Sequence, residues 1–539
     1  MKKTLFTFGL LSLTAVVLAG CGASATSKDK KSVSLMQSTD LLSLDTSNYA
    51  DLTEWNVLEN SMEGLYRADS NNNPAPGIAE KVVTPTNNGK TYTFKLRKNA
   101  KWSDGKSVTA QDFANAWRRS AAATAKSGYN YIFSGVKNAD KVSAGKLSPS
   151  KLGVKAVDSH TLRVDLDHAM PYFNKMMVLP AFFPQNTNDV KKYGKKYGTQ
   201  AKYMSYDGAF KVTGWNGTND NWKLEKNHYY YASDKVKLDE INMQVVKDSN
   251  TAHNLFTQGK LDDATVTGTV AKGVQGNKNL VHVNRAGTYY ARLNLAKGHP
   301  LANAKLRKAV NLAVDREKLT KNVLSDGSTP AYTYTAPKLT TDPTTGKDFS
   351  KETTPKEKYD STKAKQLWNE GMKESHTTGN VTLKLLGDDE GVTKEVAQYL
   401  QAELQQTLPK LKVETSNVPT KAASQSENTG KFDLSQTLWL ADYADPMTFL
   451  NILVSNNPQN HGKFSNAKYD SLLKQAETTD ASSSSKYWSD MRTAEKVLND
   501  QSPVVPLYNM VESHLVNPKL KGVLFHPVGE TDYTRAYIK

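Results

Sequence analysis

Apolar and polar residues follow two alternating patterns along this chain. The runs 91–97 (TYTFKLR) and 161–166 (TLRVDL) are short and apolar at every second position, which predicts strands with one buried face. Other segments repeat apolar residues at helical spacing and predict helices over about 303–324 and about 393–408. Strands and helices are mixed without internal repeats, so we expect an α/β protein.

A further helix is predicted by its cap. Thr109 precedes the helical segment that runs through Arg119, and Asp112 at the third helical position completes a capping-box-like pair. This helix is expected to end in the Ala-rich 120s. The helical spacing of the apolar residues predicts that most of them face the core. None of them is therefore taken as a site residue.

The first 20 residues have the pattern of a bacterial export signal. Lys2 and Lys3 precede an apolar stretch over 5–18, and small residues follow it. The segment ends in Leu-Ala-Gly-Cys21, where a lipoprotein signal is cut and its cysteine lipidated. We therefore expect Cys21 to be a lipid anchor. The alternative is an ordinary secretory signal with a cysteine near the cleavage point by chance.

The remaining chain reads as an exported, folded body. Residues 21–31 are small and polar, as in a flexible spacer, and no second long apolar run follows residue 20, so no further membrane span is predicted. The 539 residues suffice for two or three domains. Cys21 is the only cysteine, so stability has to come from a buried core and not from disulfides.

A formal net charge of +16 could serve to bind nucleic acid or an anionic surface. The 70 Lys and Arg residues are spread along the whole chain among 54 Asp and Glu residues. No basic helix, zinc-finger spacing or aromatic RNA-binding motif gathers them. We expect no nucleic-acid binding, and a solvated basic surface beside an anionic membrane or wall.

Catalytic motifs are largely absent. The sequence has no Gly-x-Ser-x-Gly, His-Glu-x-x-His or phosphate-loop motif, and its ten histidines are scattered. Residues 148–151 (SPSK) match the Ser-x-x-Lys motif of penicillin-binding enzymes, but the partner-like 126–128 (KSG) precedes them, which is the wrong order. We therefore predict no catalytic residue, no metal site and no cofactor, and a protein that is not an enzyme.

Longer patterns occur in a fixed order along the chain. They are 59–66 (ENSMEGLY), 74–80 (PAPGIAE), 94–105 (FKLRKNAKWSDG), 108–113 (VTAQDF), 207–215 (DGAFKVTGW), 306–310 (LRKAV) with Asp315 and Arg316, 330–334 (PAYTY), and 439–446 (WLADYADP) with 449–451 (FLN). By these patterns the whole mature chain resembles the oligopeptide-binding family, the extracytoplasmic family 5 solute-binding proteins of peptide-importing ABC transporters. Most pattern residues, such as Gly64, Gly77 and Trp102, are expected to be scaffold.

The resemblance implies an α/β fold of the periplasmic-binding-protein type, in which two lobes close on a ligand and a third domain packs beside one lobe. Transferred to this chain, lobe I comprises 32–63, 186–283 and 512–539, the extra domain 64–185, and lobe II 284–511. The chain then crosses between the lobes near 283 and 511, where a hinge is expected.

The resemblance also implies how a ligand is held. An extended peptide would add to the protein as a strand, with main-chain hydrogen bonds giving affinity and hydrated pockets accepting varied side chains. The flanking segments match Asp40, Leu41 and Leu42 on lobe I and Leu438, Trp439 and Leu440 on lobe II. Aromatic residues in matching segments, for which core packing is an equal alternative, are Trp439, Tyr289, Tyr290, Tyr508 and one of Tyr129 or Tyr131, of which we select Tyr131.

Asp442 matches the family position whose carboxylate pairs with the α-ammonium of the peptide. The alternative is that Asp442 caps backbone N–H groups; Asp445, which precedes Pro446, fits capping better and is taken as structural. Some family members hold the peptide's C-terminal carboxylate with arginines three and about a dozen residues before the Trp. This chain has Gln436 and Glu427 there, which favours longer or variable peptides. The alternative is that Lys421 or Lys431 takes the place of the arginines from a shifted loop.

The expected partners follow from the resemblance: an oligopeptide, an ABC permease with its ATPases, and a membrane reached through Cys21. A monomer on the extracellular side of a Gram-positive cell membrane is expected. Within the binding class, a pheromone receptor, a dipeptide receptor, or a receptor for nickel or another small solute are alternatives. A lipid-anchored enzyme or adhesin that uses the same fold is the alternative from a different class.

Overall fold

The computed structural model describes residues 31–48, 52–125 and 129–539. The predicted signal peptide, Cys21 and the spacer up to residue 30 lie outside the described residues. Lys31–Lys539 form one compact unit. The boundaries predicted for two lobes and an extra domain within this unit stay a prediction.

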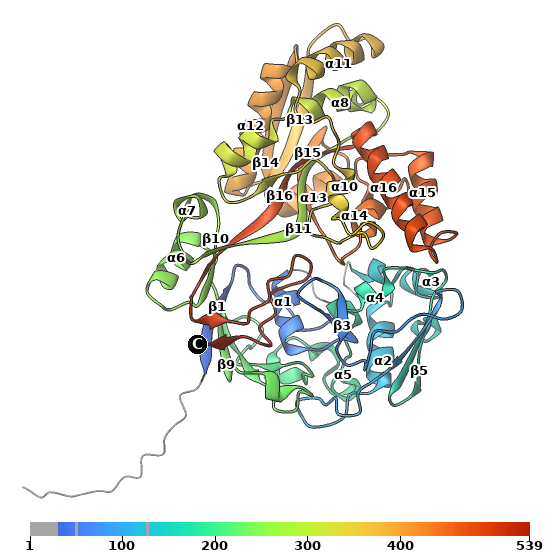
Figure 1. Ribbon diagram of the computed structural model, residues 1–539, viewed down its shortest axis with the longest axis vertical. Coiled ribbons are helices and arrows are strands. Elements are labelled where there is room, and N and C mark those ends of the chain that lie inside the picture. The colour runs from blue at the N-terminus through green and yellow to red at the C-terminus, as the bar shows by residue number, and fades with distance from the viewer. Residues whose placement is uncertain (1–30, 49–51, 126–128) are drawn as a thin grey trace, which may run out of the picture. The chain divides into compact units, whose positions relative to one another are not determined.

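One mixed sheet of eleven strands runs through the molecule, with helices packed around it, so the α/β prediction is confirmed (Figure 1). Parallel and antiparallel neighbours occur in the same sheet. In sheet order the strands are β14 (Leu411–Val418), β13 (Val381–Asp388), β15 (Leu434–Leu440), β11 (Leu280–Leu293), β16 (Val504–Val516), β10 (Asp263–Val266), β1 (Ser32–Gln37), β9 (Glu240–Val245), β8 (Asn221–Lys226) and β7 (Phe210–Thr213), with β12 (Thr329–Pro330) paired to β16.

The longer helices cover the sheet and its flanks. They are α1 (Leu52–Ser61), α2 (Ala110–Ser120), α6 (Ser249–Thr257), α8 (Ala304–Ala313), α11 (Ser361–Glu374), α12 (Gly391–Thr407), α13 (Thr420–Asn428), α15 (Ala467–Glu477) and α16 (Ser484–Gln501). Helix α12 confirms the predicted helix over 393–408 to within two residues. Among the described residues no helix combines the length and apolar character that crossing a membrane requires.

A separate three-stranded sheet confirms the two strands predicted from alternation. It consists of β4 (Thr91–Lys95), β6 (Thr161–Asp165) and β5 (Val154–Asp158), all antiparallel. Beside it, Thr109 and Asp112 form the predicted capping box: the Thr109 side chain accepts the Asp112 N–H, and the Asp112 carboxylate accepts the Thr109 N–H at 2.9 Å. Local sequence is enough to place this helix start because both partners lie within four residues.

The prediction of one helix over 303–324 is wrong. Helix α8 ends at Ala313, Val314 adopts an extended conformation, and Asp315 caps a new short helix over Arg316–Lys318 that continues to Leu324 with wider turns. The break has a physical cause: the Arg316 guanidinium is buried and donates to the carbonyl oxygens of Asn311 and Val314 at 3.1 Å. These carbonyls are therefore satisfied by a side chain and not by the next helical turn.

Strands β11 and β16 connect the two halves of the large sheet. Their pairing runs antiparallel from Leu280↔Leu515 to Arg292↔Val504, so the crossings predicted near 283 and 511 lie inside strands and not in loops. The register shifts between Asn284 and Thr288, which is a local irregularity at the predicted hinge.

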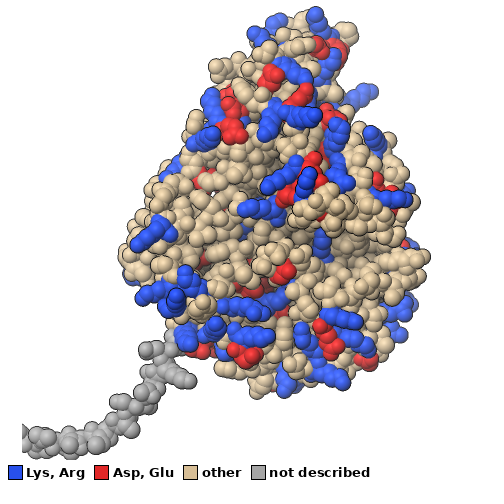
Figure 2. Space-filling model, viewed as in Figure 1, with Lys and Arg blue, Asp and Glu red and all other residues tan. Residues whose placement is uncertain are grey.

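The charge pattern also agrees with the sequence. Figure 2 shows Lys and Arg scattered over the visible face with Asp and Glu among them.

Close packing explains two glycines of the family-like patterns: a Cβ on Gly64 would lie 2.5 Å from the Phe183 ring, and one on Gly77 would lie 2.7 Å from the Gly64 carbonyl oxygen. Trp102 is 1% exposed, as expected for scaffold.

Candidate functional site

Strand β15 is the backbone of the candidate site. On one side it pairs with β11, with Tyr289 opposite Leu438, Thr288 opposite Trp439 and Gly287 opposite Leu440. On the other side β13 pairs only with Leu434 and Ser435. The main chain from 436 to 440 therefore has no strand partner on its β13 side among the described residues, which leaves an edge that an extended chain can join.

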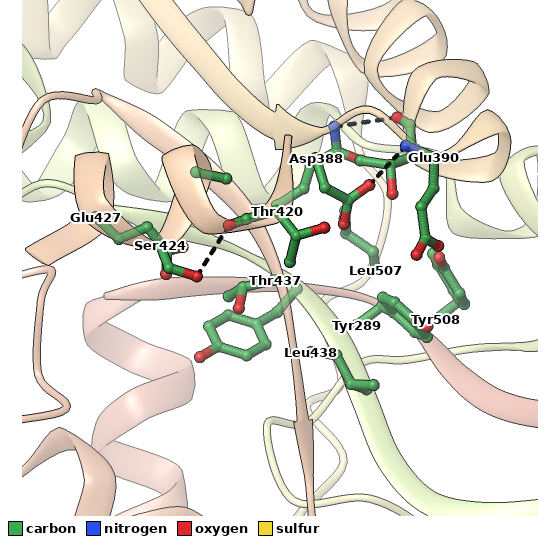
Figure 3. A pocket seen from close by; sticks show the side chains of 14 residues that line it. Tyr289, Asp388, Glu390, Thr420, Ser424, Glu427, Thr437, Leu438, Leu507 and Tyr508 are labelled. Carbon is green, nitrogen blue, oxygen red and sulfur yellow. Dashed lines mark hydrogen bonds between the residues drawn. The ribbon is translucent and has the colours of Figure 1, made fainter. Parts of the chain in front are cut away.

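A pocket of about 230 Å³ lies beside this edge (Figure 3). It brings together four of the predicted residues from three strands: Tyr289 and Tyr290 of β11, Leu438 of β15 and Tyr508 of β16. The Tyr289 and Tyr508 rings stack with their centroids 4.5 Å apart and an interplanar angle of 16°. Tyr290 is fully buried, and its hydroxyl already accepts a hydrogen bond from Arg292 at 3.0 Å. The alternative of core packing therefore fits Tyr290 better than a role in ligand binding.

The opposite wall of the pocket is acidic. Asp388 ends β13, Glu390 precedes α12, and the Glu390 N–H donates to the Asp388 carboxylate at 3.1 Å. Burial, together with the neighbouring Asp388 and Asp389, raises the pKa of the Glu390 carboxyl. None of the fourteen lining residues, all of them in the described part, is Lys, Arg or His. In the described chain no group of three or more His, Cys, Asp or Glu side chains is placed to hold a metal ion.

The two positions that depart from the family pattern also line this pocket. Glu427 forms an ion pair with Arg292 at 2.9 Å, with both side chains largely buried, and it accepts a hydrogen bond from Ser435 at 2.6 Å. Gln436 donates to the Thr393 carbonyl oxygen at 3.3 Å. The Arg292 guanidinium is thus neutralised, and none of the described residues that line the pocket offers a positive group for a C-terminal carboxylate.

Asp442 lies just beyond the end of β15 and is half-buried. Its carboxylate accepts hydrogen bonds from the hydroxyls of Tyr129 at 2.6 Å and Tyr131 at 3.5 Å. Burial raises the pKa of Asp442 to about 6, although these hydroxyls and Thr448 lower it in part. Within the described part of the chain no cation contributes to this pKa or pairs with the carboxylate. Among the described residues the carboxylate accepts hydrogen bonds from tyrosine hydroxyls and from no backbone N–H group, which does not agree with the alternative of a backbone cap.

Tyr129, rather than the selected Tyr131, makes the shorter bond to Asp442. The two rings pack edge to face at 5.2 Å, and 40% of the Tyr131 surface is exposed. Asp442 and burial together raise the pKa of the Tyr131 hydroxyl, so it stays a hydrogen-bond donor at neutral pH. Sequence spacing could not separate two tyrosines that lie two residues apart.

Asp445 has the structural role expected of it. Its Oδ1 accepts hydrogen bonds from the Met447 N–H at 3.2 Å and the Tyr487 hydroxyl at 2.5 Å. Its Oδ2 lies 3.1 Å from the Lys175 ammonium, which also donates to the Ala444 carbonyl oxygen at 2.7 Å. Lys175 belongs to the predicted extra domain, so this contact links two of the predicted domains.

The remaining predicted residues are less closely joined to the pocket. Asp40 pairs with Lys247 at 2.8 Å, Leu41 is 3% exposed and Leu42 is 64% exposed, and none of the three lines the pocket. Trp439 and Leu440 are half-buried on the open edge of β15. The Trp439 indole N–H is buried without a hydrogen-bond partner among the described residues. Cys21 lies outside the described residues.

Sequence reasoning missed the acidic wall of the pocket. The run Asp388-Asp389-Glu390 was a visible signal, but acids before a helix are ordinarily explained by the helix dipole. Only the pairing of β13 with β15, of β15 with β11 and of β11 with β16 shows that two of these acids, Asp388 and Glu390, face a pair of stacked tyrosines.

Comparisons with known proteins agree on one family. The sequence profile described as "Bacterial extracellular solute-binding proteins, family 5 Middle" matches residues 73–461. The dipeptide-binding protein of Lactococcus lactis subsp. cremoris (strain MG1363) is 34% identical over 547 aligned residues, which cover 98% of each chain.

Solved structures agree as well. The structure titled "Listeria monocytogenes OppA bound to peptide" has a TM-score of 0.80 and 34% identity, covering 95% of this chain and 99% of that one. The pheromone receptor PrgZ, solved to show its mode of peptide binding, has a TM-score of 0.80 and 36% identity, covering 95% of this chain and all of that one. The chain therefore belongs to the family 5 bacterial extracellular solute-binding proteins, with the fold of the OppA-type peptide-binding proteins.

Proposed function

We propose that this protein captures oligopeptides outside the cell and delivers them to an ABC permease. The observation that carries the proposal is the open edge of β15, which ends next to an acid without an ion-pair partner in the described chain. A peptide that adds to this edge uses main-chain hydrogen bonds, which do not depend on its sequence. The relatives named for dipeptide and oligopeptide binding support the same ligand class.

Asp442 fixes one end of the peptide in this proposal. A partly desolvated carboxylate held by two tyrosine hydroxyls is a suitable partner for an α-ammonium group, because charge-assisted hydrogen bonds strengthen where water is excluded. The pocket beside Leu438 then lies along the same edge and receives a side chain of the peptide. Neither contact requires a cofactor, a metal or a thiol.

The location of the receptor is part of the proposal. We infer that residues 1–20 are removed, that Cys21 is lipidated, and that the mature protein is a monomer tied to the outer face of a cell membrane. The sequence pattern around Cys21 and the extracellular character of the family support this. Cys21→Ala should move the protein from the membrane fraction to the medium and abolish palmitate labelling. A variant that stayed in the membrane would contradict the anchor.

The substitution Asp442→Asn tests the ligand assignment. Titration calorimetry with a free-amine peptide should show a loss of at least about 30-fold, since breaking a desolvated charge pair costs roughly 2–5 kcal/mol. The N-acetylated form of the same peptide should lose little. Asp500→Asn, on an exposed turn of α16, is the matched control. Equal losses for both peptides would refute the ammonium role.

A pheromone receptor is the second candidate, favoured by the 36% identity to PrgZ over nearly the whole chain. The two functions differ in the range of peptides bound. Mass spectrometry of peptides released from the purified, unfolded protein should show many sequences for a nutrient receptor and one sequence for a pheromone receptor. A protein that carries no peptide and titrates with none would overturn both.

A further inference from the structure

We infer that the pocket formed by Tyr289, Tyr508, Asp388 and Glu390 is a selectivity site for a basic side chain, Lys or Arg, of the bound peptide. The inference rests on the proposed peptide-binding function and adds a preference that the main-chain contacts of β15 cannot supply. It is carried by three features of the pocket: an aromatic platform, two carboxylates without cations, and a tyrosine hydroxyl to which no hydrogen bond is assigned among the described residues.

The platform is the stacked pair Tyr289 and Tyr508. With centroids 4.5 Å apart and planes at 16°, the two rings act as one aromatic wall contributed by adjacent strands. Cations bind over such rings because the ring face carries negative electrostatic potential. Figure 3 shows the Glu390 side chain reaching down towards the Tyr508 ring, so a group inside the pocket meets ring and carboxylate together.

The carboxylates of Asp388 and Glu390 have no compensating charge in the pocket. No lining residue is basic, and the nearby Arg292 is taken by Glu427 at 2.9 Å. The protein as a whole carries a formal charge of +16, so this local excess of acid is opposite in sign to its surroundings. Such a site attracts an ammonium or guanidinium group and repels a carboxylate.

The Tyr508 hydroxyl is the third feature. Tyr508 is 6% exposed and lines the pocket, yet its hydroxyl has no hydrogen-bond partner among the described residues. The hydroxyl oxygen keeps a free lone pair, so an N–H donor bound in the pocket can use it as a hydrogen-bond acceptor. Burial, together with Tyr289 and the acids around it, raises the pKa of this hydroxyl well above its usual value, so it remains a neutral group that can accept.

The test uses five-residue peptides with a free N-terminus in which Lys, Arg, norleucine, Gln or Glu is placed at each position in turn on an alanine background. At one position the wild-type protein should bind Lys or Arg about 10-fold more tightly than norleucine, and Glu should be the weakest. Glu390→Gln should reduce the Lys-to-norleucine ratio about three- to tenfold, and Asp388→Asn with Glu390→Gln should bring it close to one. Tyr508→Phe should reduce it less, because the platform remains.

Glu414→Gln is the matched control, since Glu414 is an exposed acid on β14 of the same sheet and pairs with Lys412. Glu414→Gln should leave the Lys-to-norleucine ratio unchanged. None of the variants should change the affinity for the all-alanine peptide. Raising the salt concentration should lower the ratio in the wild type and in Glu414→Gln, and should change it little in the variant that lacks both pocket acids. The same titration with Ca²⁺ or Mg²⁺ in place of peptide tests a metal occupant.

The outcomes separate this inference from the proposed function. If the all-alanine peptide binds but no position prefers a basic residue, or if Glu390→Gln leaves the preference intact, the selectivity site is refuted and the receptor function stands. If no peptide binds at all, the proposed function fails. Tight metal binding that competes with Lys peptides would assign the pocket to a cation of a different class and overturn the inference.

Discussion

Replacement of Arg285 by Met should strongly destabilise the protein at the point where the two halves of the large sheet meet. Arg285 lies on β11, and its side chain is 3% exposed. It donates to both oxygens of Glu512 at 3.0 and 3.1 Å, to Glu530 at 2.7 Å and to the Gly529 carbonyl oxygen at 2.9 Å. Met keeps most of the volume and leaves the buried Glu530 and the largely buried Glu512 without their shared cation.

The size of the effect follows from that loss. Removing one partner of a buried ion pair costs about 3–5 kcal/mol, because the remaining charge stays desolvated. Two carboxylates are affected here, but protonation limits the cost. Burial and Glu512 already raise the pKa of Glu530 to about 7 against the lowering effect of Arg285, so this group can become neutral. We therefore expect a loss of about 3–5 kcal/mol at pH 8.

The loss should depend on pH in a definite direction. Against the effect of burial, Arg285 and His514 lower the pKa of Glu512 to about 2, so in the wild type this group stabilises the fold above its unfolded pKa and loses that contribution only as the pH falls towards 2. The variant keeps His514 but lacks the part of this contribution that comes from Arg285, and its Glu530 is protonated more readily. The stability difference should therefore be larger at pH 8 than at pH 5.5.

Urea unfolding followed by tryptophan fluorescence and circular dichroism at both pH values measures the effect. The control is Arg163→Met, since the exposed Arg163 side chain pairs with Asp165 at 2.9 Å on the solvent-facing side of β6, where such pairs contribute at most about 1 kcal/mol. A loss below about 1 kcal/mol for Arg285→Met, or a loss that is the same at both pH values, would refute the reasoning.

Three further predictions follow from the contacts described above. Lys175→Met removes the link to Asp445 between two predicted domains, so peptide affinity should fall about 5- to 30-fold through faster dissociation, equally for free-amine and N-acetylated peptides in a kinetic binding assay. Because Asp442 has a pKa of about 6 and binds an ammonium only when ionised, calorimetry should show free-amine peptides binding more weakly below pH 6, up to tenfold per pH unit, while N-acetylated peptides change little. Thr109→Ala removes a cap and should cost about 0.5–2 kcal/mol in urea unfolding, whereas Thr109→Ser should be nearly neutral.

The sequence predicts those elements whose determinants are local. The capping box at Thr109 and Asp112 and the helix ending near residue 408 could be located because every contact that defines them lies within a few residues. The break at Val314 could not, since the apolar spacing continues across it. It depends on a buried guanidinium whose Nε donates to the Pro506 carbonyl oxygen, about 190 residues away in the chain.

Some residues of the candidate site could be predicted from the sequence and others could not. The family pattern located Leu438, Tyr289 and Tyr508, which the structure brings into one pocket. The acid wall at Asp388 and Glu390 comes from a different segment, and its charge becomes meaningful only once β13, β15 and β11 are placed side by side. Periodicity reports which face of a strand is buried, but it carries no information on which strands are neighbours.

The pairing of β11 with β16 also gives a physical reason why binding and hinge motion can be coupled. Arg285 lies within the irregularity between Asn284 and Thr288, and its partner Glu512 pairs with Val283 just before it. The stacked Tyr289 and Tyr508 follow directly after the irregularity. By the predicted bounds, Arg285 and the tyrosine platform belong to lobe II, and Glu512 and Glu530 belong to lobe I. A rotation at this irregularity would therefore carry the platform with lobe II and change the ion pairs of Arg285, which join the two lobes. The site and the hinge thus share two strands, so a ligand that orders the platform restrains the rotation without any longer path through the protein.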